Sequence, residues 1–127
     1  LAGGSVSPFI PGDQTPYHDQ PMASLETVLN CLAVLRLKNP HWIIPAVSAM
    51  NLVGAGGYKK AIQAGANLVT INLTPDEQRD DYLLYRRDRF IMNEDRVLQA
   101  IEQAKCEPSA ESLAHFLQSK FLLSSAV

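Results

Sequence analysis

The sequence predicts an α/β fold: a partial (β/α) barrel of about three βα units with parallel strands, followed by C-terminal helices. Two observations support this class. Short runs rich in β-branched residues alternate along the chain with stretches whose apolar residues recur at helical spacing. The chain has 127 residues, 46% of them hydrophobic and 19% charged, which is the size and composition of one small globular domain. Three units are too few to close an eight-stranded barrel.

The first βα unit occupies the N-terminal third of the chain. Val6 to Ile10 is a short apolar stretch between glycines and prolines, which predicts a strand of a few residues. After a polar loop, Ser24 is a favourable N-cap, and Asn39-Pro40 ends the helical pattern. The apolar positions between them are Leu25, Val28, Leu29, Leu32 and Leu35.

The second and third units follow the same order. Trp42 to Ser48 is short, continuous and β-rich, which is typical of a buried strand, although Pro45 removes one ladder donor. A glycine run, residues 54–57, leads into a predicted helix over residues 58–64 that ends at Gly65. Asn67 to Leu73 is the third predicted strand.

Helices are expected for the remainder. Thr74, Pro75 and Glu77 have the spacing of a capping box, and the charged stretch from Asp76 to Arg89 is expected to be a solvated surface segment. Asn93 is the predicted cap of an amphipathic helix carrying Val97, Leu98, Ile101 and Ala104. After Pro108-Ser109 a last helix carries Leu113, Phe116, Leu117 and Phe121.

Composition excludes several functions. A formal charge of −2 provides no excess basic field for nucleic acid or an anionic membrane, and no apolar run is long enough to span a bilayer. Cys31 and Cys106 lie 75 positions apart and the three histidines are scattered, so no metal site is expected. We expect two reduced, buried thiols and a cytoplasmic location. The opening Leu1-Ala2-Gly3-Gly4, without a Met or a signal-peptide pattern, suggests a fragment of a longer protein.

Small polar side chains follow each predicted strand. Ser48 and Asn72 lie at the ends of predicted strands, and Thr15 and Thr74 follow the first and third strands; the carboxyl ends of the three strands share one rim if the strands are parallel. Hydroxyls and amides orient a polar ligand but transfer protons poorly at neutral pH, so no catalytic residue is assigned. For Thr74 the simpler role is a helix cap. A phosphate cradle on the amides of residues 54–57 is the weaker alternative, because the glycine spacing matches no known phosphate loop.

Five segments in order resemble the C-terminal half of biotin-synthase-like radical SAM enzymes, the biotin and thiamin synthesis associated domain. The resemblance covers about residues 5–108 and is closest to the group of hydrogenase maturases, methylornithine synthase and the [Fe]-hydrogenase cofactor protein. The segments are Ser7 to Pro16, Leu35 to Pro40, Ile44 to Met50, Ala64 to Asn67, and Asn72 to Pro75.

The resemblance implies a division of the chain into residues 1–108, part of a radical SAM-type barrel, and residues 109–127, a C-terminal helix and tail. It also implies that Thr15, Ser48, Asn72 and Thr74 line the cavity for S-adenosylmethionine and a small-molecule substrate. Biotin synthase places an Arg cluster ligand near Ala46, so true biotin synthase is disfavoured.

The three closely spaced cysteines that hold the radical SAM [4Fe-4S] cluster are absent. The chain alone is therefore expected to be catalytically inactive and to bind no cofactor, with S-adenosylmethionine and the cluster belonging to the parent enzyme and its missing N-terminal half. As an isolated fragment it is expected to form homo-oligomers through the unpaired edge near Val6 to Ile10 or through its apolar inner face. The alternative is a stand-alone small α/β ligand-binding module without catalysis.

Overall fold

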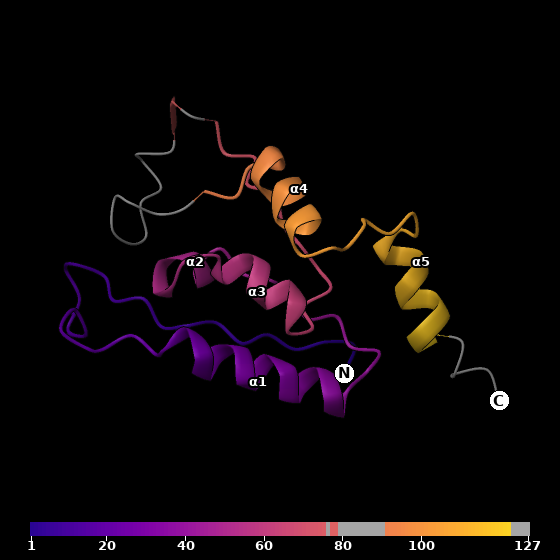
Figure 1. The fold of residues 1–127 in the computed structure, drawn as a ribbon, viewed down its shortest axis with the longest axis horizontal. Helices are drawn as coiled ribbons and strands as arrows, with labels where there is room; N and C mark the ends of the chain where they lie inside the picture. Colours follow the sequence, from indigo (N-terminus) through magenta and orange to yellow (C-terminus); the bar gives the residue numbers. More distant parts are fainter. Residues whose placement is uncertain (76, 79–90, 123–127) are drawn as a thin grey trace.

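The chain folds into helices joined by extended segments. The structure, a computed structural model, describes residues 1–75, 77–78 and 91–122 (Figure 1). Its helices are α1 (Leu25–Lys38), α2 (Met50–Val53), α3 (Gly57–Gln63), α4 (Glu94–Gln103), α5 (Leu113–Leu117) and the π-helix η2 (Gln118–Leu122). The extended segments comprise residues 2–10, 42–47 and 67–73.

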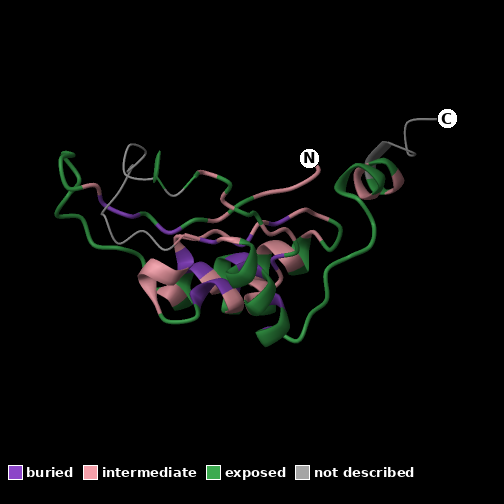
Figure 2. Ribbon diagram, turned by 90° about the horizontal axis from the view of Figure 1, so that it is seen from above, coloured by how far each residue is buried: buried purple, intermediate pink, exposed green. Residues whose placement is uncertain are grey.

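The helices cover one face of the extended segments. Figure 2 shows the extended chain as one layer with α1 to α4 beneath it, and the buried residues lie between the two. Helix α3 packs between α1 and α4, and α2 precedes it on the same face (Figure 1). Helix α5 continues directly into η2, and the two lie to one side of these helices (Figure 1).

The predicted parallel-stranded partial barrel is wrong for this structure. Within the described residues no strand forms, and the extended segments are joined only by isolated parallel bridges, Gly3 to Ile43 and Pro45 to Leu68. The runs 6–10, 42–48 and 67–73, which we expected to be strands, are extended chain without a continuous ladder, apart from Ser48, which starts the turn into α2. Nearby side chains explain why each ladder stops.

Pro45 ends the pairing between the first and second segments. The Ile43 amide donates to the carbonyl of Ala2 at 3.0 Å, and the Gly4 amide donates to the carbonyl of Ile43 at 3.1 Å. In a parallel ladder the next bond on this side would come from residue 45, two positions further on. Proline has no N–H, so that bond cannot form.

An asparagine side chain replaces the backbone between the second and third segments. The Leu68 amide donates to Ile44 O at 3.2 Å and the Ala46 amide donates to Leu68 O at 2.9 Å, which makes one bridge. Before it, the Ile44 amide donates to Asn67 Oδ1 at 2.8 Å, while Asn67 Nδ2 donates to Trp42 O at 3.2 Å. The side-chain carboxamide of Asn67 thus takes the place in which the backbone N–H and C=O of Ala66 would pair with the second segment. The backbone N–H of Ala66 instead donates to Ala61 O at 3.0 Å and closes the end of α3.

The helices predicted after Ser24, over residues 58–64 and after Asn93 are confirmed. Ser24 caps α1 by accepting from the Thr27 amide at 3.1 Å, and Asn93 caps α4 by accepting from the Arg96 amide at 3.1 Å. Gly65 follows α3 with a φ of 117°, a conformation that favours glycine. The stretch from Asp76 to Arg89, apart from residues 77 and 78, and the side chain of Phe121 lie outside the described residues.

The core lies between the helices and the second extended segment. Leu32, Ile44, Met50, Tyr58 and Val97 are the largest side chains with less than 2% exposure. Each element from α1 to α4 thus contributes a large side chain to one cluster. Burial of these apolar groups is the main favourable term that holds the helices to the extended layer.

Arg36 joins the ends of two helices to the second segment. Its Nε donates to Gly65 O at 2.8 Å, and its Nη1 donates to Pro40 O and Trp42 O, both at 2.9 Å. The guanidinium therefore lies where the negative dipole ends of α1 and α3 meet. Desolvation by burial lowers the pKa of Arg36 below its ordinary value, and Nη2 has no hydrogen-bond partner among the described residues.

We expect Arg36→Met to lower the free energy of unfolding by about 2–4 kcal/mol, because several carbonyls lose a charged donor. Arg36→Lys should lower it by about 1–3 kcal/mol, since one ammonium cannot reach the same set of carbonyls. The measurement is urea unfolding followed by far-UV circular dichroism. Lys38→Met, an exposed position in the last turn of α1, is the control. A loss for Lys38→Met equal to that for Arg36→Met would contradict the assigned role.

Candidate functional site

Three of the four predicted site residues belong to one hydrogen-bonded series. The Asn51 amide donates to Ser48 O at 3.1 Å, and Asn51 Nδ2 approaches Met92 Sδ at 3.7 Å. The Asn72 amide donates to Met92 O at 2.9 Å, and the Thr74 amide donates to Asn72 Oδ1 at 2.8 Å. We call Ser48, Asn51, Met92, Asn72 and Thr74 the Asn51–Asn72 series.

The series connects the ends of the second and third extended segments. Ser48 starts the turn into α2 and Asn72 ends the third segment, and both are half-buried. The Ser48 hydroxyl makes no hydrogen bond with any described residue. The side-chain oxygen of Asn72 already accepts a hydrogen bond from the Thr74 backbone N–H.

Thr15 is not linked to this series by any interaction in the described part of the chain. It lies in an exposed turn, where its hydroxyl donates to Gly12 O at 3.0 Å and its carbonyl accepts from the His18 amide at 3.1 Å. The nearby Phe9 and Tyr17 rings pack edge to face, with centroids 6.4 Å apart. The turn and α2 lie toward the same end of the molecule (Figure 1).

Met92 is a member of the Asn51–Asn72 series that the sequence analysis did not single out. It immediately precedes the Asn93 cap, and Val97 lies four positions into the helix; both side chains are buried. An apolar residue before the cap paired with one at this position is a hydrophobic staple. That spacing could have placed Met92 at the start of α4, although not its contact with Asn51.

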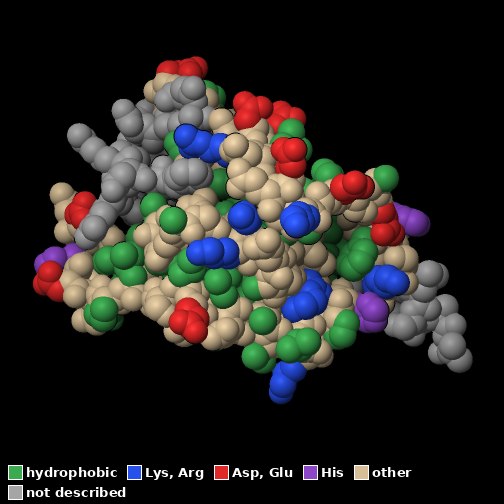
Figure 3. All heavy atoms as spheres, in the orientation of Figure 1, with side chains coloured by type: hydrophobic (Ala, Val, Ile, Leu, Met, Phe, Trp, Pro, Cys, Tyr) green, Lys and Arg blue, Asp and Glu red, His purple; other side chains and the backbone are tan. Residues whose placement is uncertain are grey.

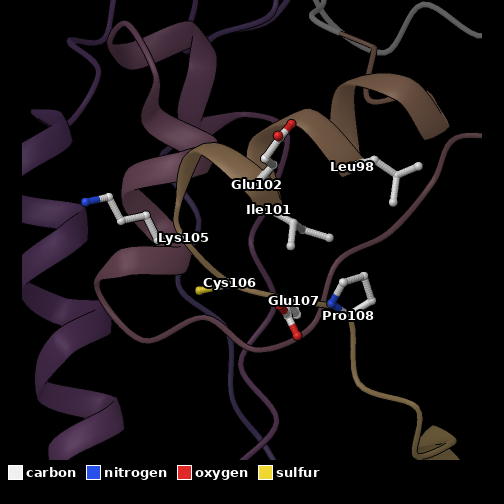
Figure 4. A pocket seen from close by; sticks show the side chains of 7 residues that line it. All are labelled: Leu98, Ile101, Glu102, Lys105, Cys106, Glu107 and Pro108. Atoms are coloured by element: carbon white, nitrogen blue, oxygen red, sulfur yellow. The ribbon is translucent and has the colours of Figure 1, made fainter.

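Three cavities lie near or between the helices. One of about 240 Å³ separates α3 from α4 and includes Asn51 and Met92 of the series in its wall. A second, of about 380 Å³, lies at the C-terminal end of α4 (Figure 4), and a third, of about 600 Å³, lies between α5 and the extended segments. None of these three is lined by Thr15, Ser48, Asn72 or Thr74.

The described residues do not form a metal site. No group of three His, Cys, Asp or Glu side chains could hold an ion in this part of the chain. Cys31 and Cys106 are free and exposed, so the expectation of buried thiols is wrong: Cys31 lies on the outer face of α1 and Cys106 just beyond the end of α4. These residues do not fit an iron–sulfur cluster.

The glycine run does not form the phosphate cradle considered above. The Gly57 amide already donates to Gly54 O at 3.1 Å, and Gly57 is buried. A Cβ at Gly57 would approach the Met50 carbonyl oxygen to 2.0 Å, so close backbone packing requires glycine here.

Among the described residues, no helix is long and apolar enough to cross a membrane.

Tyr58 places a phenol in the core beneath the third segment. The residue is 1% exposed, and its hydroxyl has no hydrogen-bond partner among the described atoms. Desolvation raises the pKa of the Tyr58 hydroxyl, and the backbone of Thr70, which faces it without good hydrogen-bond geometry, partly opposes this shift. The neutral phenol is therefore the form that the folded protein prefers.

Because the folded protein prefers the neutral phenol of Tyr58, the free energy of unfolding should fall with rising pH in the alkaline range. Because the folded-state pKa of Tyr58 lies above the unfolded value of 10.0, stability is fully present below pH 10 and falls as the pH rises through the folded pKa. We expect Tyr58→Phe to be about as stable as the parent at pH 7 and to lose this part of the alkaline decline. Thermal unfolding between pH 7 and pH 11 measures the stability of each protein at pH 7 and its decline at alkaline pH. Identical alkaline slopes for the two proteins would contradict the assignment, and Tyr17→Phe, an exposed tyrosine, is the control.

Known proteins resemble the chain over much of its length. No protein-family model matches it. It is 34% identical over 80 residues to the [FeFe] hydrogenase maturase subunit HydE of Thermotoga maritima, which covers 63% of this chain and 23% of the relative. It is 37% identical over 83 residues to 3-methylornithine synthase of Methanosarcina barkeri, covering 65% of this chain and 23% of that enzyme. The Methanosarcina acetivorans 3-methylornithine synthase is 31% identical over 109 residues, covering 84% of this chain and 31% of that enzyme.

The chain thus spans between about a quarter and a third of the length of the curated relatives that it matches. Two of these relatives carry the same enzyme name and the third is a hydrogenase maturase, which are two of the three kinds of protein that the sequence motifs indicated. The resemblance is therefore confirmed: the chain is homologous to part of the radical SAM enzymes of the hydrogenase maturase and methylornithine synthase group.

Proposed function

We propose that this chain is the C-terminal, substrate-side part of a radical SAM enzyme of this group, and that another part of the enzyme supplies the cluster. The similarity to HydE and to two 3-methylornithine synthases supports the family. The two exposed, widely separated cysteines do not fit a [4Fe-4S] cluster. The role of this chain is then to bind and orient a small polar substrate rather than to hold metal.

The Asn51–Asn72 series is the observation that carries this proposal. It links residues at the ends of two extended segments through backbone and carboxamide hydrogen bonds, and Ser48, Asn72 and Thr74 among them carry small hydroxyl or amide side chains. Such groups fix the orientation of a polar ligand by hydrogen bonds and do not themselves titrate near neutral pH. In this proposal Ser48, Asn72 and Thr74 contact the substrate or S-adenosylmethionine, and Thr15 joins them from the neighbouring turn.

The proposal also divides the chain. Residues 1–108 contain the core cluster and the whole Asn51–Asn72 series. Residues 109–122 contain α5 and η2, in which no described side chain is buried. The first part would then hold the ligand, and residues 109–127 would form a peripheral helix and tail.

A chimera tests the substrate-side role. The matching region of Methanosarcina barkeri 3-methylornithine synthase is replaced by this chain, and the cluster is reconstituted under anaerobic conditions. Asn72→Ala should lower turnover about tenfold or more by removing a positioning group, and the visible absorption of the cluster should stay unchanged. Asn30→Ala, at an exposed position on α1, is the matched control and should leave both readouts unchanged.

Equal effects of Asn72→Ala and Asn30→Ala on turnover would contradict the role assigned to Asn72. The isolated chain provides a second test, because it should form no stable cluster in the same reconstitution. A cluster on the isolated chain that cleaves S-adenosylmethionine would overturn the proposed division of labour.

We further propose that the isolated chain self-associates through its N-terminal extended segment. Beyond the bridge at Gly3, the described residues provide no backbone hydrogen-bond partner for Ser5 to Ile10, and Phe9 is 47% exposed. Unpaired extended chain with apolar side chains promotes pairing between copies. Light scattering should show a dimer or higher oligomer, and Phe9→Lys should shift it toward the monomer. Tyr17→Lys, in the adjacent loop, is the control, and a monomeric parent at high concentration would exclude this association.

A further inference from the structure

A cavity between α3 and α4 adjoins the Asn51–Asn72 series, with which it shares Asn51 and Met92. Its volume is about 240 Å³. Among the described residues, the charged ones in its wall are Lys59 and Arg96, and no described Asp or Glu lines it. The remaining polar side chains in the wall belong to Asn51, Tyr58, Gln99 and Gln103.

Helix α4 places its non-acidic polar residues toward this cavity. Arg96, Gln99 and Gln103 are three, four and seven positions apart, so they share one face of the helix. The acidic residues Glu94, Asp95 and Glu102 belong to the same helix but do not line the cavity. Figure 3 shows Lys and Arg side chains gathered over the middle of this face of the molecule.

Asn51, in the wall of this cavity, has a side-chain N–H donor with only a weak hydrogen-bond partner. Its Oδ1 accepts from the Tyr58 amide at 2.9 Å, and this bond fixes which end of the carboxamide carries the NH₂ group. The only acceptor near Nδ2 among the described residues is Met92 Sδ at 3.7 Å, and thioether sulfur is a weak acceptor. A half-buried amide donor with so weak a partner can bind a stronger acceptor from solution.

The two cations complete a set of donors. Lys59 makes no hydrogen bond or ion pair with any described residue, and it is half-buried. Arg96 donates through Nη1 to Ile91 O at 2.8 Å, which holds its charge at the start of α4 beside the cavity. Ammonium, guanidinium and amide donors around one cavity favour an anion with several oxygen acceptors.

We propose that the cavity between α3 and α4 binds a small oxyanion of the phosphate type, through Asn51 Nδ2, the Lys59 ammonium and the positive charge of Arg96. A water molecule occupies about 30 Å³ of liquid volume, so the cavity accommodates a phosphate ion with a few waters. The site uses side chains rather than the amides of the glycine run. It shares Asn51 with the Asn51–Asn72 series but uses none of Thr15, Ser48, Asn72 and Thr74, to which the proposed function assigns the substrate contacts.

The test is a titration of the 127-residue chain with inorganic phosphate, followed by ¹H–¹⁵N NMR at constant ionic strength. We expect saturable shifts for the side-chain amide of Asn51 and for residues of α3 and α4. Lys59→Gln should weaken the affinity about tenfold by removing a charged donor. Lys60→Gln is the matched control, because Lys60 is the exposed neighbour and does not line the cavity.

Further variants separate binding from folding. Asn51→Asp keeps an oxygen for the Tyr58 amide but replaces the donor with a carboxylate oxygen, so it should abolish saturation. Lys59→Arg should restore an affinity within about threefold of the parent, because it retains the charge. Absence of saturable shifts in the parent, or equal weakening by Lys59→Gln and Lys60→Gln, would overturn the proposal.

Discussion

The hydrogen bonds of Arg36 are the constraint on which the rest of the structure depends. One guanidinium binds the carbonyl after α3, at Gly65, and carbonyls of the turn after α1, at Pro40 and Trp42. It therefore sets where the second and third extended segments begin relative to both helices. Gly65 completes this arrangement, because a Cβ there would approach the Arg36 side chain to 2.7 Å.

Beyond the Arg36 contacts, a side chain makes hydrogen bonds that backbone groups make in a regular sheet. Asn67 bonds Ile44 and Trp42 where a parallel ladder would place residue 66, and Pro45 has no donor for the first segment. The buried Tyr58 hydroxyl lies beneath the third segment, facing the backbone of Thr70. The extended layer thus owes its place to the core beneath it, built on Ile44 and its neighbours, more than to its own hydrogen bonds.

The same core positions the two proposed sites. Asn51 follows the second segment, and Met92 precedes α4; together they connect the Asn51–Asn72 series to the cavity between α3 and α4. The Met92 carbonyl binds the Asn72 amide, while its side chain is buried among the helices. The proposed substrate and the proposed oxyanion would therefore bind at two places connected by Asn51 and Met92. Ser48, Asn72 and Thr74 would contact the substrate, and Asn51, Lys59 and Arg96 would contact the oxyanion.

Local sequence determined the helices, because their signals act within a few residues. Ser24 and Asn93 cap the helices that follow them, and Gly65 ends α3, as these residue types predict. Motifs also indicated the family, and Ser48, Asn72 and Thr74 were selected by their place after apolar runs. Only the tertiary structure decided whether those runs pair as strands, because a ladder requires a donor and an acceptor at matched positions of a distant segment. Pro45 and the Asn67 side chain removed those matches, and the contact between Asn51 and Met92, 41 positions apart, had no local signal.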